Sequence, residues 1–327
     1  MKKVGFTTSV PVEVIFAAGY TPVDLNNIFI TAPNPSGLVE MAESHGFPRS
    51  ACSWIKGMYS AIIDSGDIDI LIAVVEGDCA NGRALLEVLE RKGLKCIPFS
   101  YPNSRKYNLL QDEILGLFQF LGIELTGCKK VKNELDDVRK RLIYLDELTW
   151  KHNKATGFEN HIWQVSSSDF NGDYGIFAQD LDKQILSIEN RTPKEESKRM
   201  GYMGVPPING DIYDFIETLD ARVVYNEVQR QFTMADSIGV EDIVKVYRNF
   251  TYPYSLEGRL RDIRNQIKKR EIHGMIHYAQ AFCFRGIEDI IIKEELEIPV
   301  LTIEGDRPGS LDQRTKLRIE AFIDMLD

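Results

Sequence analysis

Residues 277–306 constrain the fold of this chain more strongly than any other stretch. They begin inside an apolar run, 275–282, that is typical of a buried strand, and Cys283 follows directly at its end. An amphipathic segment with isoleucine and leucine residues at helical spacing comes next. A second apolar run then covers 300–303. Strand, helix and strand in this order predict one βαβ unit of a parallel sheet.

The position of Cys283 suits a metal–sulfur centre. In open α/β sheets, ligands bind beyond the carboxyl ends of the strands, and Cys283 lies at such an end. A helix is predicted to begin beside it, and the backbone N–H groups at a helix N-terminus favour an anion or a thiolate. The alternative is a small, inert apolar side chain in a core, which is the commoner role of a cysteine thiol.

Size and charge exclude several functions. The chain has 327 residues, 43% of them hydrophobic, which suffices for two domains with separate cores. The formal net charge is −10 without a basic run, so we expect no nucleic-acid partner. Glu13 interrupts the apolar N-terminal segment, which disfavours a signal sequence, and no apolar run is long enough to span a membrane. We therefore expect a cytoplasmic protein whose five cysteines are thiols or metal ligands.

Strands and helices alternate in both halves of the chain, which predicts the α/β class with parallel sheets. We expect an N-terminal α/β domain over 1–125, a helical connector over 126–198 and a C-terminal α/β domain over 199–327. The connector is marked by one long amphipathic helix and further helical pieces. The predicted strands cover residues 3–8, 27–31, 68–75, 95–99, 200–205, 221–225, 275–282 and 300–303.

Three of the five cysteines share a setting. Cys52, Cys79 and Cys283 each lie in a turn near a strand end that leads into a helix, whereas Cys96 lies inside a strand and Cys128 precedes two lysines. Three thiolates from separate loops could meet in a cleft between two domains. Three protein ligands on a four-iron cluster would leave one iron open, as three ligands leave an exchangeable position on catalytic zinc. For Cys96 and Cys128 we favour a structural role. No zinc-finger spacing is present, which disfavours structural zinc.

Four further residues are candidates with two interpretations each. Ser9 and Glu13, near the end of the first strand, could act on a substrate hydroxyl or proton; alternatively, Ser9 caps the first helix and Glu13 favours its positive end. His277 is expected to be a hydrogen-bonded core histidine rather than a base. Arg285 could stabilise the charge of a cluster or pair with a neighbouring acid.

Several motifs carry a likeness to a known family. They are TTSVPVEVIFAAGYTPVDLN at 7–26, SACSW at 50–54, EGDCANGR at 76–83, QAFCFRGIED at 280–289, IPVLTIEGD at 298–306 and RTKLRIEAFIDML at 314–326. Together they resemble the 2-hydroxyacyl-CoA dehydratase and benzoyl-CoA reductase family, whose iron–sulfur subunits work with an ATP-driven activator. The likeness covers both ends of the chain but not the connector.

The resemblance implies a fold, a cofactor and partners. It implies two Rossmann-like domains with an iron–sulfur cluster, [4Fe-4S], in the cleft between them, held by Cys52, Cys79 and Cys283. It also implies a homodimer, or a dimer with a homologous second subunit, and a separate activator ATPase with its own cluster. No GxxxxGK[ST] phosphate loop occurs, which agrees with ATP hydrolysis by a partner.

The implied activity is the dehydration of a 2-hydroxyacyl-CoA by one low-potential electron. The electron enters the thioester carbonyl, a ketyl radical forms, the hydroxyl leaves, and the electron is recovered. A second branch of similar proteins joins two cubanes into a double-cubane cluster and reduces small molecules. A third alternative is a non-catalytic electron-transfer cluster protein. An acyl-CoA substrate needs cations for its phosphates, and the acidic chain shows no basic patch.

Overall fold

The computed structural model describes residues 1–195 and 198–326 and divides into two compact units. The first unit comprises Met1–Lys140, Ser166–Ala178 and Met234–Ser255, and the second comprises Arg141–Val165, Gln179–Thr233 and Leu256–Asp327. The range predicted as a connector is helical. Its long helices α7 (Leu125–Trp150) and α9 (Tyr174–Glu189) each contribute residues to both units.

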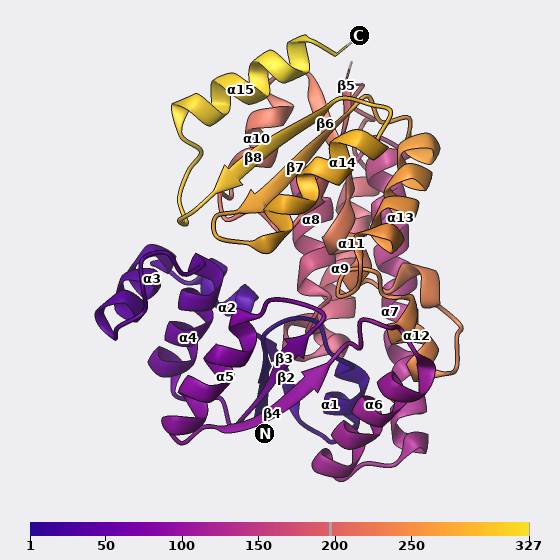
Figure 1. Ribbon diagram of the computed structural model, residues 1–327. Coiled ribbons are helices and arrows are strands. Elements are labelled where there is room, and N and C mark those ends of the chain that lie inside the picture. Colours follow the sequence, from indigo (N-terminus) through magenta and orange to yellow (C-terminus); the bar gives the residue numbers. More distant parts are fainter. Residues whose placement is uncertain (196–197, 327) are drawn as a thin grey trace. The chain divides into compact units, whose positions relative to one another are not determined.

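The first unit is built on a parallel sheet of four strands in the order β2-β1-β3-β4. In Figure 1, helices α1 and α6 lie on one face of this sheet and α4 and α5 on the other. Because helices cover both faces, β3 is a nearly continuous run of buried apolar residues. The elements are β1 (Lys3–Phe6), α1 (Val12–Ala17), β2 (Thr21–Asp24), α4 (Ser53–Ser65), β3 (Ile70–Glu76), α5 (Asn81–Arg91), β4 (Lys95–Ser100) and α6 (Tyr107–Leu121).

The second unit repeats this arrangement with the order β6-β5-β7-β8. Helices α10 and α15 lie on one face of its sheet and α13 and α14 on the other (Figure 1). The predicted βαβ unit is confirmed, with a short 3-10 helix, η3, inserted before its helix. The elements are β5 (Lys198–Gly204), α10 (Ile212–Glu217), β6 (Ala221–Asn226), α13 (Leu256–Arg270), β7 (Gly274–Gln280), η3 (Phe284–Glu288), α14 (Asp289–Glu295), β8 (Val300–Gly305) and α15 (Gln313–Asp324).

Both sheets therefore have one topology. In each, the second strand pairs with one side of the first strand, and the third and fourth strands follow on the other side. The strand order reverses between the first and third strands, and ligands bind at such a switch point in doubly wound sheets. The α/β prediction with two Rossmann-like units is confirmed, and each unit has its own switch point, at β1/β3 and at β5/β7.

One predicted strand is wrong. Residues 27–31 lie in helix α2 (Leu25–Thr31), and the second strand is instead β2, where Thr21 pairs with Lys3. The side chain of Asp24 accepts the N–H of Asn26 at 2.9 Å and so caps the helix. The apolar residues of α2 resemble a strand in sequence, but only Leu25 and Phe29, on one helical face, are buried.

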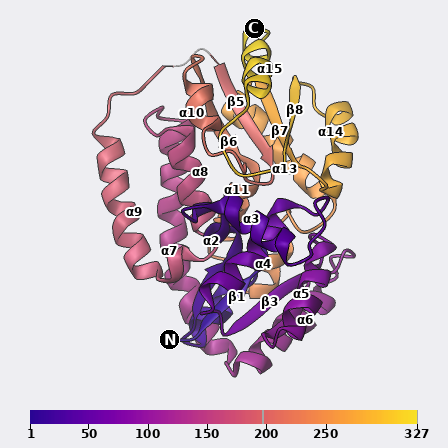
Figure 2. The same cartoon turned by 90° about the vertical axis from the view of Figure 1, so that its left-hand side faces the viewer.

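The remaining elements extend the two units. The first unit also contains α3 (Pro35–Ser44), η1 (Phe170–Gly172), η2 (Ala235–Ser237) and α12 (Ile243–Asn249). In the second unit, α8 (Gly157–Ser166) lies beside the β6 edge of the sheet (Figure 2), where a Cβ on Gly157 would come within 3.0 Å of Val223. Helix α11 (Glu227–Phe232) follows β6 directly.

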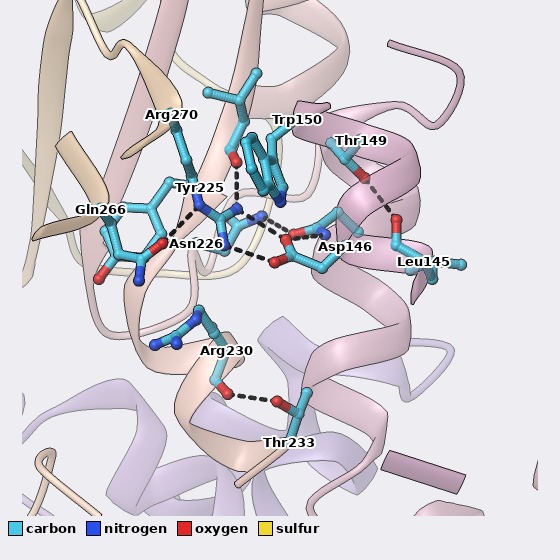
Figure 3. Close-up of polar contacts among 12 residues, drawn as sticks. Leu145, Asp146, Thr149, Trp150, Tyr225, Asn226, Arg230, Thr233, Gln266 and Arg270 are labelled. Atoms are coloured by element: carbon cyan, nitrogen blue, oxygen red, sulfur yellow. Dashed lines mark hydrogen bonds and ion pairs between the residues drawn. The ribbon is translucent and has the colours of Figure 1, made fainter. Parts of the chain in front are cut away.

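A buried polar network joins α7 to α13 within the second unit (Figure 3). The guanidinium of Arg270 forms two hydrogen bonds with the carboxylate of Asp146, at 2.9 and 2.6 Å. It also donates to the carbonyl oxygen of Val224 at 2.6 Å and to Gln266 Oε1 at 2.8 Å. Asn160 donates a further hydrogen bond to Asp146 at 2.9 Å.

Candidate functional site

Cys79 lies in a tightly packed turn after β3. The strand ends at Glu76, and Gly77 adopts a positive φ of 91° before the chain reaches Cys79 and enters α5 at Asn81. A Cβ at Gly77 would lie 2.5 Å from the carbonyl oxygen of Pro253 and 2.6 Å from Tyr101 Cβ. Only glycine therefore fits at this position without moving the turn that carries Cys79.

Cys52 occupies the N-cap position of α4 in the same unit. It is buried in an apolar cluster that includes Leu85 and Leu89 from α5, and Cys79 packs against that cluster. One predicted ligand is thus a member of this apolar cluster, and a second packs against it in the same unit. The hydroxyl of Ser53, next to Cys52, is fully buried and has no hydrogen-bond partner within residues 1–195 and 198–326.

Cys283 lies in the equivalent turn of the second unit. Its N–H donates to the carbonyl oxygen of Gln280 at 3.0 Å, and its own carbonyl accepts the N–H of Gly286 at 3.1 Å, so Cys283 is the N-cap of η3. The preceding residue, Phe282, has a positive φ of 65° and an exposed side chain. Such a backbone conformation is uncommon for a bulky residue.

Cys79 and Cys283 are topological equivalents. Each is the third residue after the third strand of its sheet, since β3 ends at Glu76 and β7 at Gln280. Each therefore follows a strand that borders the switch point of its unit. The sequence showed that both cysteines follow a strand and precede a helix, but only the strand order shows that the two strands are equivalent.

The other two cysteines have different surroundings. Cys96 lies within β4, where burial and the nearby Glu90 carboxylate raise the pKa of its thiol to about 11. Cys128 is buried on α7, and burial together with Glu13 raises its pKa to about 12. Burial thus disfavours the thiolate form of both side chains, and their structural role stays a prediction.

Glu13 is the centre of a buried polar cluster after β1. Its Oε1 lies 2.8 Å from Arg139 Nη2 as an ion pair, and its Oε2 accepts a hydrogen bond from the Tyr247 hydroxyl at 2.7 Å. Burial alone would lower the pKa of Arg139, but the neighbouring Glu13 and Tyr247 oxygens outweigh it and raise that pKa above its ordinary value. The guanidinium therefore stays charged. Arg139 also pairs with Asp136, 3.2 Å away. These partners lie far from Glu13 in the chain and gave no signal in the sequence.

Ser9 does not cap the first helix, so that interpretation is wrong. The helix begins at Val12 with Pro11 at its N-cap, and no side chain among residues 1–195 and 198–326 caps it. The backbone oxygen of Ser9 accepts the Tyr101 hydroxyl at 2.7 Å, while the Ser9 hydroxyl is buried without a hydrogen-bond partner in the described parts of the chain. Glu13 does lie in the first turn of the helix, as predicted.

His277 is a core histidine, as predicted. It is buried within β7, and its Nδ1 lies 2.7 Å from Asp289 Oδ1. Burial alone would raise the pKa of Asp289, but hydrogen bonds from Lys293, Thr302 and His277 outweigh it and lower that pKa to about 2. A few residues on, Arg285 Nη1 lies 3.5 Å from Glu288 Oε1, which matches the pairing interpretation of Arg285.

Neither a group of metal-binding side chains nor a membrane-spanning helix occurs in the described parts of the chain. Across residues 1–195 and 198–326, no three His, Cys, Asp or Glu side chains are grouped as they would be around a metal ion. No helix in these ranges has the length and apolar character needed to cross a membrane. The fold and the cysteine turns define a protein of two doubly wound α/β units with a cysteine after the third strand of each sheet.

Comparison with known proteins identifies the family. The sequence profile described as "2-hydroxyglutaryl-CoA dehydratase, D-component" matches residues 7–326, nearly the whole chain. The chain therefore belongs to this family, which is the family whose motifs it resembles. No curated protein matches the sequence.

Proposed function

We propose that this chain is the iron–sulfur component of a 2-hydroxyacyl-CoA dehydratase, with Cys52, Cys79 and Cys283 as the protein ligands of a [4Fe-4S] cluster. The observation that carries the proposal is the family match over residues 7–326. The equivalent positions of Cys79 and Cys283 support the choice of ligands, because both follow a strand at a switch point.

The residues around the first two cysteines fit such a group. Thiolates are the ligands that iron–sulfur clusters use, and the side chains of Cys52 and Cys79 both contact one apolar cluster within the first unit. The buried Ser53 hydroxyl lacks a hydrogen-bond partner among the described residues, and a cluster sulfide beside Cys52 would supply the acceptor. When bound, the cluster would supply one-electron chemistry at low potential.

Ser9 and Glu13 would have different roles in this reaction. The Ser9 hydroxyl, at the switch point of the first unit, is buried and has no partner in the described chain, so it can donate to a substrate oxygen. The carboxylate of Glu13 is already engaged by Arg139 and Tyr247. These contacts would fix the position of the loop that follows β1. We therefore assign substrate contact to Ser9 and loop positioning to Glu13.

The proposal includes a partner that supplies the electron. The chain has no phosphate loop of the P-loop type, so ATP hydrolysis would belong to a separate activator with its own iron–sulfur cluster. Its cationic docking residues would suit a chain with a net charge of −10, and their association should weaken with salt. A second subunit, identical or homologous, would complete the enzyme in the cytoplasm.

Mixing the anaerobic protein with a reduced activator of this family tests the partner. We expect the cluster to be reduced only when ATP is present, and its visible absorbance measures the reduction. Reduction at the same rate without ATP, or none with any nucleotide, would remove the activator from the account.

One observation favours a second candidate, a double-cubane-type reductase of small molecules or an electron carrier. The formal net charge of the chain is −10, which disfavours binding of the coenzyme A phosphates. Turnover of a 2-hydroxyacyl-CoA would support the dehydratase, whereas reduction of small molecules without acyl-CoA turnover would support the second candidate.

A further inference from the structure

A chain of buried and partly buried charges leads from the end of β5 to the turn that carries Cys283. Its centre is Arg259 on α13, which is fully buried. The Nε and Nη2 atoms of Arg259 donate to the two carboxylate oxygens of Glu227, at 2.6 and 2.9 Å. Its Nη1 donates to Oε2 of Glu288. One guanidinium thus bridges two carboxylates from different elements.

Each carboxylate extends the bridge to one side of the switch point. Glu227 Oε2 also accepts the N–H of Gly204, the last residue of β5, at 3.0 Å. Glu288 Oε1 lies 3.5 Å from Nη1 of Arg285, which is buried two residues after Cys283. Gly204 ends β5 and Cys283 follows β7, and these are the two strands between which the sheet order reverses. The charges therefore connect both sides of the switch point in the second unit.

The bridge depends on the shape and charge of arginine. The charges of the two guanidinium groups cancel those of the two carboxylates if all four are ionised. The four groups are those of Arg259, Arg285, Glu227 and Glu288. Without Arg259, the buried carboxylate of Glu227 and the partly buried carboxylate of Glu288 would face one remaining cation, Arg285, and an uncompensated buried charge must be neutralised or move toward water. Glu288 belongs to η3, so its movement would loosen the helix that begins at Cys283. A lysine could not replace the bridge, because one ammonium cannot engage both Glu227 oxygens and reach Glu288.

We propose that Arg259 is a positioning residue for Cys283. Its bridge between Glu227 and Glu288 holds the Cys283 turn to the end of β5 and so presents the thiol in one orientation. The role of Cys283 as a cluster ligand rests on the proposed function, whereas the effect of Arg259 on the turn does not.

Hydrogen exchange of the metal-free full-length chain tests the turn directly. The amides of Cys283 and Gly286 both donate within the turn, so their exchange reports its opening. In Arg259→Met we expect exchange in peptide 281–288 to rise about tenfold, equivalent to about 1.4 kcal/mol of opening free energy. Exchange in peptide 77–83, around Cys79 in the first unit, should not change.

Arg270→Met is the matched control. Arg270 lies on the same helix, is equally buried and forms a bidentate ion pair with Asp146, but it makes no contact with the Cys283 turn among its described hydrogen bonds. Exchange in each variant is compared with that of other protected peptides of the second unit, such as the peptide that covers β6, so that a general loss of stability is not counted. Opening of peptide 281–288 beyond that reference in Arg259→Met, but not in Arg270→Met, supports the proposal. Equal excess opening in both variants, or none in Arg259→Met, overturns it. If Arg259→Met does not fold, Arg259→Lys retains a positive charge, and the same selective opening is expected.

Anaerobic reconstitution with iron and sulfide separates this inference from the proposed function. A wild-type chain that binds no iron would refute the proposed function, whatever the exchange shows. If the wild type binds iron, we expect Arg259→Met to bind less and to change the electron paramagnetic resonance spectrum, with Arg270→Met close to wild type. An unchanged spectrum and iron content in Arg259→Met would refute the positioning role.

Discussion

Removal of either partner of the Asp146–Arg270 ion pair should destabilise the second unit by about 3–5 kcal/mol. The pair is bidentate, with oxygen–nitrogen distances of 2.9 and 2.6 Å, and Arg270 is 1% exposed at its side chain. In Arg270→Met, the carboxylate of Asp146 keeps a hydrogen bond only from Asn160 among the contacts described for it. A buried charge with so little compensation accounts for most of the cost.

Removal of both charges should cost less than the sum of the single changes. In the double variant Asp146→Leu/Arg270→Met, no unpaired charge remains, although the carbonyl of Val224 loses its donor. We expect a coupling energy of about 2–3 kcal/mol between the two positions. The exposed pair Arg141–Asp182, with side chains 41% and 51% exposed, provides a control in the same unit, and its coupling should be about 0–1 kcal/mol.

Urea unfolding followed by tryptophan fluorescence measures these differences. Of the three tryptophans, Trp54 lies in the first unit and Trp150 and Trp163 in the second, so Trp54→Phe restricts the signal to the second unit. Trp150 also packs against the Arg270 guanidinium, 5.3 Å from the ring centroid. Single and double changes that add within about 0.5 kcal/mol, at constant m-value, would refute the reasoning.

Two further predictions concern the first unit. Gly77→Ala should destabilise it by about 1–3 kcal/mol and disturb the Cys79 turn, because alanine is strained at φ 91° and its Cβ would clash with the carbonyl oxygen of Pro253. Thermal unfolding measures this loss of stability. An unchanged midpoint would contradict the prediction. Burial and the Asp24 carboxylate raise the pKa of Asp169 from 3.8 to about 7, so the folded state binds its proton more tightly than the unfolded state. The free energy of unfolding should therefore fall as the pH rises from about 4 to 7. Asp169→Asn should make this pH dependence weaker in urea titrations. An identical dependence in both proteins would show that Asp169 is not the group that titrates.

Local patterns predicted the sheets well. Apolar runs such as β3 and β7 are buried on both faces, so they stand out in sequence as strands of a parallel sheet. The second strand was missed because β2 is only four residues long and includes Pro22, whereas the apolar residues of α2 beside it resemble a strand. The hydrogen bond from the N–H of Asn26 to the side chain of Asp24 caps this helix at its N-terminus.

The polar clusters could not be predicted, because their contacts join distant parts of the chain. Glu13 is held by Arg139 and Tyr247, and Arg259 bridges Glu227 and Glu288. No spacing rule relates such residues. The cysteine turns were found because a strand end followed by a helix start is a local signal. Their equivalence in the two units became visible only from the strand order.

Iron and acid-labile sulfide per chain, measured after anaerobic purification, test the central claim most directly. The wild type and Cys96→Ala should retain the cluster, with about four irons per chain for one [4Fe-4S] centre and only a modest stability loss in Cys96→Ala. Cys283→Ala should lose the brown chromophore or keep an incomplete cluster, and Cys52→Ala and Cys79→Ala should behave likewise. A wild type without iron, or equal iron loss in Cys96→Ala and Cys283→Ala, would contradict the account.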